Sequence, residues 1–440
     1  MKIIKLLISI TVVSFPLYII RCGNISYCFS PVPFTLLEVL IITTFIFWLG
    51  YLAKNGEINP LRLYQRLKNP LLMPAGLFLL AAGLSVLITP DLKGGLGIFK
   101  AYFVEPIMLF FVVLYTCRKE KDIRWVLTSL IFSGFWLSVL AIFQGIAGFS
   151  FFAPEEAAQG RSTAVYNSAN ALGLYLGPIV AISIGLLLET FDIKDKRLVI
   201  LNKKNFWILI LSLLLNLSAI GLTKSTGSFI ALVATLLFWF VFLLYSRVGD
   251  SVRQFIKKAL VLSVVIFSIS AIWFFLTISY FTPNERFTYP RKFTDTKTIR
   301  LCTWEGTKNL LLAKPFLGVG LDGFHDSYPK YRTCDSEYFQ YPHNIFLNFW
   351  AETGLLGLIA FIWISVVYTR HLFGVNKSQF LTGALLAGLV YIWSHGLVDV
   401  PYFKNDLASQ FWLLAALSVS AGERQGMVSR VKLFLRSFLK

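Results

Sequence analysis

Long apolar runs alternate with short polar segments along most of the 440-residue chain. Nearly uncharged runs of about 18 residues or more are long enough to cross a hydrocarbon core of roughly 30 Å as helices. The pattern therefore predicts an all-α polytopic membrane protein with about twelve transmembrane helices. The predicted spans are residues 3–20, 32–53, 71–89, 98–116, 124–147, 171–190, 206–223, 228–246, 258–281, 345–369, 379–397 and 407–422.

One polar segment, residues 282–344, is much longer than the others and separates the ninth predicted span from the tenth. It divides the chain into helices one to nine (1–281), the long loop (282–344), helices ten to twelve (345–422) and a basic tail (423–440).

Within the long loop, residues 298–312 have the pattern of an amphipathic helix. Asp295 is its predicted N-cap, and Pro315 lies just beyond its end. The stretch Gly318-Val-Gly-Leu-Asp-Gly323 has the letters of a dinucleotide fingerprint, but no strand precedes it in a βαβ unit. We therefore expect a tight turn with unusual backbone angles there.

Lysine and arginine residues concentrate in the amino terminus, in alternate loops and in the tail. The short loops of the other side hold one basic residue each: Arg21, Lys93, Arg161, Lys224 and Lys404. By the positive-inside rule, both termini are predicted to be cytoplasmic and the long loop external. This placement accounts for the net charge of +18 without a nucleic-acid partner.

The predicted topology divides the cysteines between the two sides of the membrane. Cys22, Cys28, Cys302 and Cys334 fall on the predicted external side, and Cys117 falls at the inner face. Of the three possible disulfide connectivities, the one that pairs cysteines close in sequence is Cys22–Cys28 with Cys302–Cys334. The alternative is that all four thiols are free. The four histidines show no metal-ligand spacing, and the external side has no acidic cluster of the cation-binding kind, so neither a metal nor another cofactor is expected.

Charged side chains also occur inside the predicted spans, where they usually face a cavity or a partner. The five candidates lie in the outer third of their spans: Glu38, Lys100, Glu105, Glu352 and His395. A water-accessible cavity open to the external side would account for all of them, whereas an interfacial position is the alternative for Lys100 and His395. Asn344, Asn348 and Glu352 are spaced by four and share one helix face, with Gly354 and Gly357 permitting close helix approach.

Four motifs follow one another in and after the long loop. They are Arg300-Leu-Cys-Thr-Trp304, Pro315-Phe-Leu-Gly-Val-Gly-Leu-Asp-Gly-Phe324, His343-Asn344 and Ala351-Glu-Thr-Gly-Leu-Leu-Gly357. In order and spacing they resemble the signature of the O-antigen ligase and polymerase superfamily, which are bacterial envelope glycosyltransferases. Two further stretches are similar to the family more weakly: Tyr166-Asn-Ser-Ala-Asn-Ala-Leu-Gly173 and His395-Gly-Leu-Val-Asp399.

The resemblance has one departure. The family usually has an arginine in a Ser-Arg-Gly motif before the eighth span, and this chain has Thr226 at that position, within Thr223-Lys-Ser-Thr-Gly227. Lys224 is the nearest basic residue and a candidate replacement.

The resemblance implies transfer of a glycan from a polyprenyl (undecaprenyl) diphosphate carrier to an acceptor hydroxyl, outside the membrane and without a nucleotide sugar. Pre-placed cations would stabilise the departing diphosphate, so we assign this role to Arg300, with Lys224 and Arg161. A histidine suits proton removal from the acceptor hydroxyl, or its orientation, and His343 is the candidate.

Other residues of these motifs are expected to support that reaction. Glu352 and Asn344 would position His343 or the acceptor, and the remaining candidates for substrate binding are Asn170, Trp304, His395 and Asp399. Structural readings stay open: a surface ion pair for Arg300, a helix start for His343, and packing for His395 and Asp399.

Three functions fit the sequence. The first is an O-antigen ligase-like transferase of the bacterial inner membrane, in lipopolysaccharide or surface polysaccharide biosynthesis, with a lipid-core or glycan acceptor. The second is a polymerase, or a protein O-oligosaccharyltransferase, of the same family. The third is a lipid or polysaccharide transporter, whose typical inverted repeats and broken helices at the midplane are not evident in the sequence.

Overall fold

The computed structural model describes residues 1–20, 34–191, 203–247, 273, 276–277, 296–333, 339–373 and 379–438. Within these ranges the chain forms helices and no strand, which confirms the predicted all-α class. The elements are α1 (Lys2–Val13), η1 (Phe15–Ile19), α2 (Leu36–Lys54), α3 (Pro60–Leu67), α4 (Leu72–Val86), α5 (Leu92–Ile98), η3 (Phe99–Val104), α6 (Glu105–Thr116), α7 (Glu120–Ala147), α8 (Pro154–Ala158), α9 (Ala169–Thr190), α10 (Lys203–Thr223), α11 (Thr226–Arg247), α13 (Thr296–Ala313), α14 (Phe324–Ser327), η5 (Tyr328–Lys330), α15 (Ile345–Phe373), α16 (Gln379–Gly396) and α17 (Asn405–Phe438).

Seven helical stretches in the described part of the chain are long and apolar enough to cross a membrane. They are Leu36–Lys54, Leu92–Thr116, Glu120–Ala147, Ala169–Thr190, Asn205–Thr223, Thr226–Tyr245 and Ile345–Leu372. α4 is apolar but shorter. The predicted first span is interrupted, because Pro16 cannot continue α1 and the short helix η1 follows. The predicted ninth span, 258–281, lies almost entirely outside the described residues, so the count of twelve remains a prediction.

α9 and α16 pack against each other in the centre of the bundle. Close approach depends on glycines of α9: a Cβ on Gly177 would overlap the Tyr391 ring of α16, and one on Gly185 would lie 2.7 Å from the Ala384 Cβ of α16. The Tyr391 hydroxyl donates a hydrogen bond to the Gly173 carbonyl at 2.9 Å. Small residues and interhelical hydrogen bonds of this kind hold helices together in membranes.

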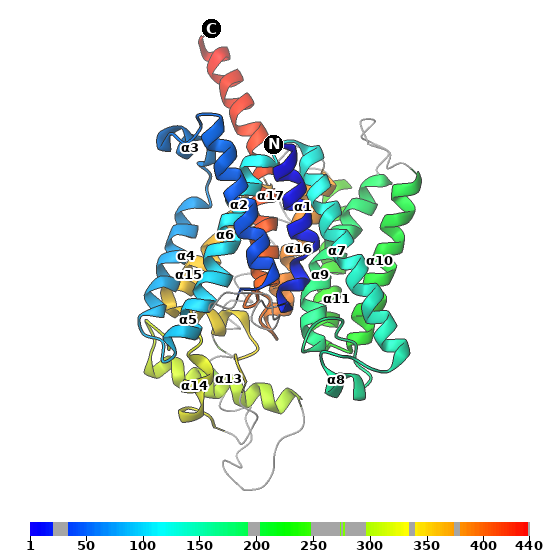
Figure 1. Ribbon diagram of the computed structural model, residues 1–440, viewed down its shortest axis with the longest axis vertical. Coiled ribbons are helices and arrows are strands. Elements are labelled where there is room, and N and C mark those ends of the chain that lie inside the picture. Colours follow the sequence, from blue (N-terminus) through cyan, green and yellow to red (C-terminus); the bar gives the residue numbers. More distant parts are fainter. Residues whose placement is uncertain are drawn as a thin grey trace.

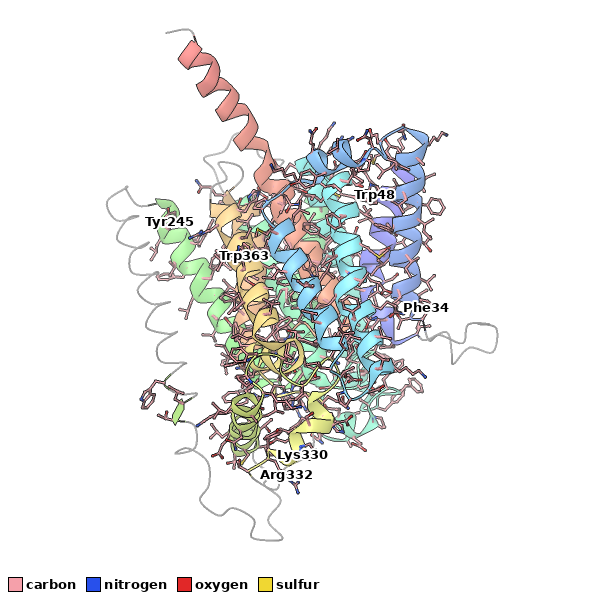
Figure 2. The ribbon with its side chains drawn as sticks, turned by 90° about the vertical axis from the view of Figure 1, so that its left-hand side faces the viewer. Phe34, Trp48, Tyr245, Lys330, Arg332 and Trp363 are labelled. Atoms are coloured by element: carbon pink, nitrogen blue, oxygen red, sulfur yellow. The ribbon has the colours of Figure 1, made fainter. Side chains whose placement is uncertain are left out.

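The two ends of the bundle carry different elements. The amino terminus and the carboxyl-terminal extension of α17 lie at one end, whereas α8, α13 and α14 lie at the other (Figure 1). Lys330 and Arg332 mark this second end, here called the α13 end, in the perpendicular view (Figure 2). The termini therefore share one face, as predicted; which face is cytoplasmic remains a prediction.

Three of the predicted intramembrane charges pair with one another. The Lys100 ammonium lies 3.1 Å from the Glu38 carboxylate and 4.0 Å from that of Glu105. Glu38 also accepts hydrogen bonds from the Thr35 backbone N–H and the Asn405 amide. This cluster ties α2, η3 and α17 together, but both buried Glu105 oxygens lack a hydrogen-bond partner among the described residues. The water-accessible cavity expected from the sequence remains a prediction.

Candidate functional site

The predicted loop helix is present as α13, although its expected N-cap, Asp295, lies outside the described residues. Arg300 and Trp304 are four residues apart and therefore share a face of α13. The Trp304 indole donates a hydrogen bond to the Pro342 carbonyl at 2.8 Å, so this face lies against the segment that leads into His343. Cys302 is disulfide-bonded, while its predicted partner Cys334 lies outside the described residues, as do Cys22 and Cys28.

His343 is held in an unusual backbone conformation at the start of α15. Its φ of +51° is uncommon for a residue other than glycine. Asn344 caps the helix by accepting from the Phe346 and Leu347 N–H groups, and its amide donates to the Leu397 carbonyl at 3.0 Å. These bonds fix the start of α15 against the segment that follows α16.

The His343 ring contacts a buried carboxylate from that same segment. Its Nδ1 lies 3.3 Å from Asp399 Oδ1. An ionised carboxylate only accepts hydrogen bonds, so the proton is placed on Nδ1 and Nε2 is left as the acceptor nitrogen. The His343 side chain is 19% exposed, against 3% for Asp399, so the ring is anchored on its inner edge and reachable on the other.

Asp399 dominates the electrostatics of this region. Burial would raise the pKa of Asp399, but the hydrogen bond from His343, with the nearby His343 and His395 side chains, holds it well below its usual value. Burial lowers the pKa of Arg300, and the charge of Asp399 opposes that effect. Lys404 behaves similarly: burial lowers its pKa, while Asp406 and Asp399 oppose this. Two cations therefore lie in the field of one carboxylate.

His395, near the end of α16, is fully buried. Neither of its ring nitrogens has a hydrogen-bond partner among the described residues, and the same holds for the buried Asn348 amide. A Cβ on Gly227 would lie 2.7 Å from His395 Nε2, so the ring packs directly on the first turn of α11. Buried polar atoms without a protein partner are rare and point to a functional or solvated site.

Glu352, predicted to position His343 or the acceptor, is bonded to the glycine-rich turn. Its buried carboxylate accepts hydrogen bonds from the Asp322 N–H at 2.7 Å and the Phe324 N–H at 3.4 Å. It therefore holds the glycine-rich turn, in which Gly318 and Gly320 adopt the predicted positive φ values of 67° and 88°. The His343 ring is contacted by Asp399, and a role of Glu352 in positioning the acceptor remains a prediction.

Arg161, Asn170 and Lys224 form a second polar group. The Arg161 guanidinium donates to the Glu156 carboxylate at 2.6 Å, the Asn170 amide oxygen at 2.9 Å and the Thr223 carbonyl at 2.8 Å. The exposed Lys224 ammonium donates to the Gln159 carbonyl at 3.2 Å. This group joins α8, the start of α9 and the α10–α11 turn, and Gly227 links that turn to His395.

The geometry agrees with a comparison of the sequence with known families. Residues 211–362 match the family model described as O-antigen ligase. The matched segment, 152 of the 440 residues, is similar to the O-antigen ligase family. No curated protein matches the chain in the corresponding search.

The matched segment includes Arg300, Trp304, the glycine-rich turn, His343 and the first part of α15, and it supports a relationship to the O-antigen ligase superfamily. His395, Asp399, Arg161 and Asn170 lie outside the matched segment but are folded against it, whereas Lys224 lies within it. Thr226, at the position of the family's arginine, is exposed at the start of α11.

Two residues of this region were missed as site residues. Lys404 was counted in the sequence only as a loop charge, although its spacing from Asp399 was a usable signal. Glu156 gave no signal, because its role depends on the fold. Among the described residues, no group of three or more His, Cys, Asp or Glu side chains is arranged to hold a metal ion.

Proposed function

We propose that this protein transfers a glycan from a polyprenyl diphosphate carrier to an acceptor hydroxyl at the external face of the bacterial inner membrane. The observation that carries the proposal is the His343–Asp399 pair beside Arg300. It combines a candidate base with a cation in the field of one carboxylate, and both His343 and Arg300 lie in the segment that matches the O-antigen ligase family model.

In the proposed reaction, His343 Nε2 removes the proton of the acceptor hydroxyl. Asp399 holds the ring through Nδ1 and stabilises the imidazolium that forms, as a carboxylate does beside a catalytic histidine. The acceptor oxygen forms a bond to the anomeric carbon of the glycan, and the bond from that carbon to the diphosphate oxygen breaks. The diphosphate leaves with the electron pair, still attached to its polyprenyl chain.

Arg300 stabilises the departing diphosphate. Its guanidinium has no hydrogen-bond partner or ion pair within the described part of the chain, so its planar fork of donors is available to two phosphate oxygens. Partial burial strengthens that interaction relative to open water. The further candidates for substrate binding near His343 are Trp304, Asn344 and His395. The candidates in the neighbouring polar group are Lys224, Arg161 and Asn170.

The test is glycan transfer in proteoliposomes that contain the full chain, a polyprenyl-diphosphate-linked glycan and candidate acceptors. We compare wild type with His343→Ala and with the control His371→Ala, which removes a half-buried histidine bonded to the Val419 carbonyl at the far end of α15. The proposal predicts acceptor-bound glycan and free polyprenyl diphosphate from wild type and control, and neither from His343→Ala.

The acceptor that becomes glycosylated also reports the branch of the family: a lipid core for a ligase, a growing glycan for a polymerase, or a protein for an oligosaccharyltransferase. Movement of the intact donor between leaflets, without any transfer, would contradict the proposal and support a transporter. Full transfer by His343→Ala would contradict the role of that residue.

A further inference from the structure

A break in α15 is filled by a loop that follows α13. Gly354 leaves helical geometry, with φ 69° and ψ 179°. The Leu355 N–H, freed by this break, donates to the Phe316 carbonyl at 2.9 Å. The Trp350 indole donates to the Pro315 carbonyl at 2.6 Å. The loop of residues 314–318, here called the wedge loop, is thus hydrogen-bonded into the side of a membrane-spanning helix.

The position of these bonds sets the depth of the wedge loop. Leu355 lies about 15 Å along α15 from Ile345, at 1.5 Å per residue. The apolar stretch Ile345–Leu372 has 28 residues, so at about 42 Å it exceeds the hydrocarbon core by roughly 12 Å. The excess is shared between the two ends of α15, so the wedge loop lies about 3–15 Å inside the hydrocarbon boundary, in the outer half of the hydrocarbon core. Non-helical backbone is tolerated at such depth only when its polar groups are satisfied inside the protein, as they are here.

The side chains of the wedge loop are apolar and uncovered. Phe316 is 72% exposed and Leu317 is 59% exposed, and Leu87 beyond the end of α4 is 77% exposed. A cavity of about 360 Å³ lies among them, lined by Ile88, Lys314, Pro315, Phe316, Leu317 and Gly318. An apolar surface at this depth is favourable against acyl chains and unfavourable against water.

Lys314 supplies a positive charge at the edge of this apolar surface. Its ammonium is exposed and has no hydrogen bond or ion pair within the part of the chain that the structure describes. A lysine in this position extends its apolar stem along the hydrocarbon and places its charge among the headgroups. The combination matches an amphiphile with acyl chains and a phosphate.

We infer that the wedge loop is a binding surface for a phospholipid of the leaflet at the α13 end. The acyl chains of this lipid would lie on Phe316 and Leu317, and its phosphate would lie at Lys314. The donor lipid of the proposed reaction is a different molecule. Arg300 and Lys314 are separated by 14 residues of α13, which is about 21 Å at 1.5 Å per residue, so one diphosphate does not reach both. Bound lipid would anchor the end of α13 opposite Arg300.

Insertion is tested with a spin label at Leu317→Cys in bilayers, by comparing relaxation by oxygen with relaxation by an aqueous nickel complex. Cys117 is buried and Cys302 is disulfide-bonded. Oxygen is expected to relax the label at 317 more strongly than the nickel complex does, as for a label at Leu84→Cys on α4. The opposite is expected for a label at Lys330→Cys at the α13 end (Figure 2). If the nickel complex relaxes the label at 317 as strongly as the label at 330, insertion of the wedge loop into the bilayer is overturned.

Headgroup binding is tested by native mass spectrometry of protein released from phosphatidylglycerol nanodiscs. Lys314→Glu is expected to retain about fivefold less lipid than wild type, while the control Lys330→Glu, another exposed lysine, retains as much. Equal retention by both variants would overturn the contact with Lys314. Displacement of the lipid by polyprenyl diphosphate at equal concentration would overturn the assignment of the occupant. Neither measurement depends on glycan transfer.

Discussion

The sequence predicts the same ligand for Arg161 and Arg300, but their surroundings differ. Arg161 donates hydrogen bonds to Glu156, Asn170 and the Thr223 carbonyl. Arg300 has no such partner in the described structure and lies in the field of Asp399 instead. A guanidinium whose donors are already used holds the protein together, whereas one whose donors are free is ready for an anion. We therefore propose Arg300, rather than Arg161, as the main phosphate contact.

Substitution of Arg300 should mainly lower kcat, whereas substitution of Arg161 should mainly lower the melting temperature. Arg300→Ala is expected to lower kcat for glycan transfer about 10²–10³-fold, because it removes a charge contact to the departing diphosphate. Arg161→Ala is expected to lower the melting temperature by several degrees and to reduce kcat less, because it breaks a hydrogen-bonded junction. Transfer rates and thermal unfolding in detergent measure both. A stable but inactive Arg161→Ala protein, beside an active Arg300→Ala protein, would reverse the comparison.

Glu352 offers a second separation of structural from chemical roles. Glu352→Gln keeps an oxygen that accepts from the Asp322 and Phe324 N–H groups, so it should retain activity within about tenfold. Glu352→Ala leaves these N–H groups without their acceptor and should lower stability and activity together, by about 1–3 kcal/mol in the free energy of unfolding. If Glu352→Gln abolishes transfer at unchanged melting temperature, the carboxylate has a chemical role that the hydrogen bonds do not explain.

The smallest effect on stability is expected from substitution of Asp322 in the glycine-rich turn. Burial, with Asp91 and Asp326 nearby, raises the pKa of Asp322. The ionised form is therefore disfavoured by folding, and stability is lost as pH rises from the unfolded pKa through the higher folded pKa. Asp322→Asn removes this penalty and tolerates the φ of 63°. Its melting temperature should exceed that of wild type by about 1–3 °C at pH 7, and the difference should shrink toward pH 4. A lower melting temperature at both pH values would contradict this reading.

Local features of the fold could be predicted from the sequence. Apolar runs located most of the described helices, because the requirement for about 18 apolar residues acts within one segment. The period of α13 and the positive φ values of Gly318 and Gly320 are likewise local properties.

The contacts between distant segments could not be predicted in this way. The spacing of Asn344, Asn348 and Glu352 predicted one helix face, but not that Glu352 meets the glycine-rich turn while Asn348 stays without a partner among the described residues. His343 and Asp399 are 56 residues apart, and only the packing of α15 against the end of α16 brings them together. The same limit applies to Glu38 and Lys100, which pair although they are 62 residues apart.

The most direct test of the central claim is a double-mutant cycle on the His343–Asp399 pair. Initial rates of glycan transfer are measured for His343→Ala, Asp399→Ala and the double variant, at equal amounts of folded protein in proteoliposomes. Because the two residues act as one unit in the proposed reaction, the double variant should be about as slow as His343→Ala alone. Losses that multiply, so that the double variant is slower by the product of the two single effects, would show that the residues act independently and would contradict the account.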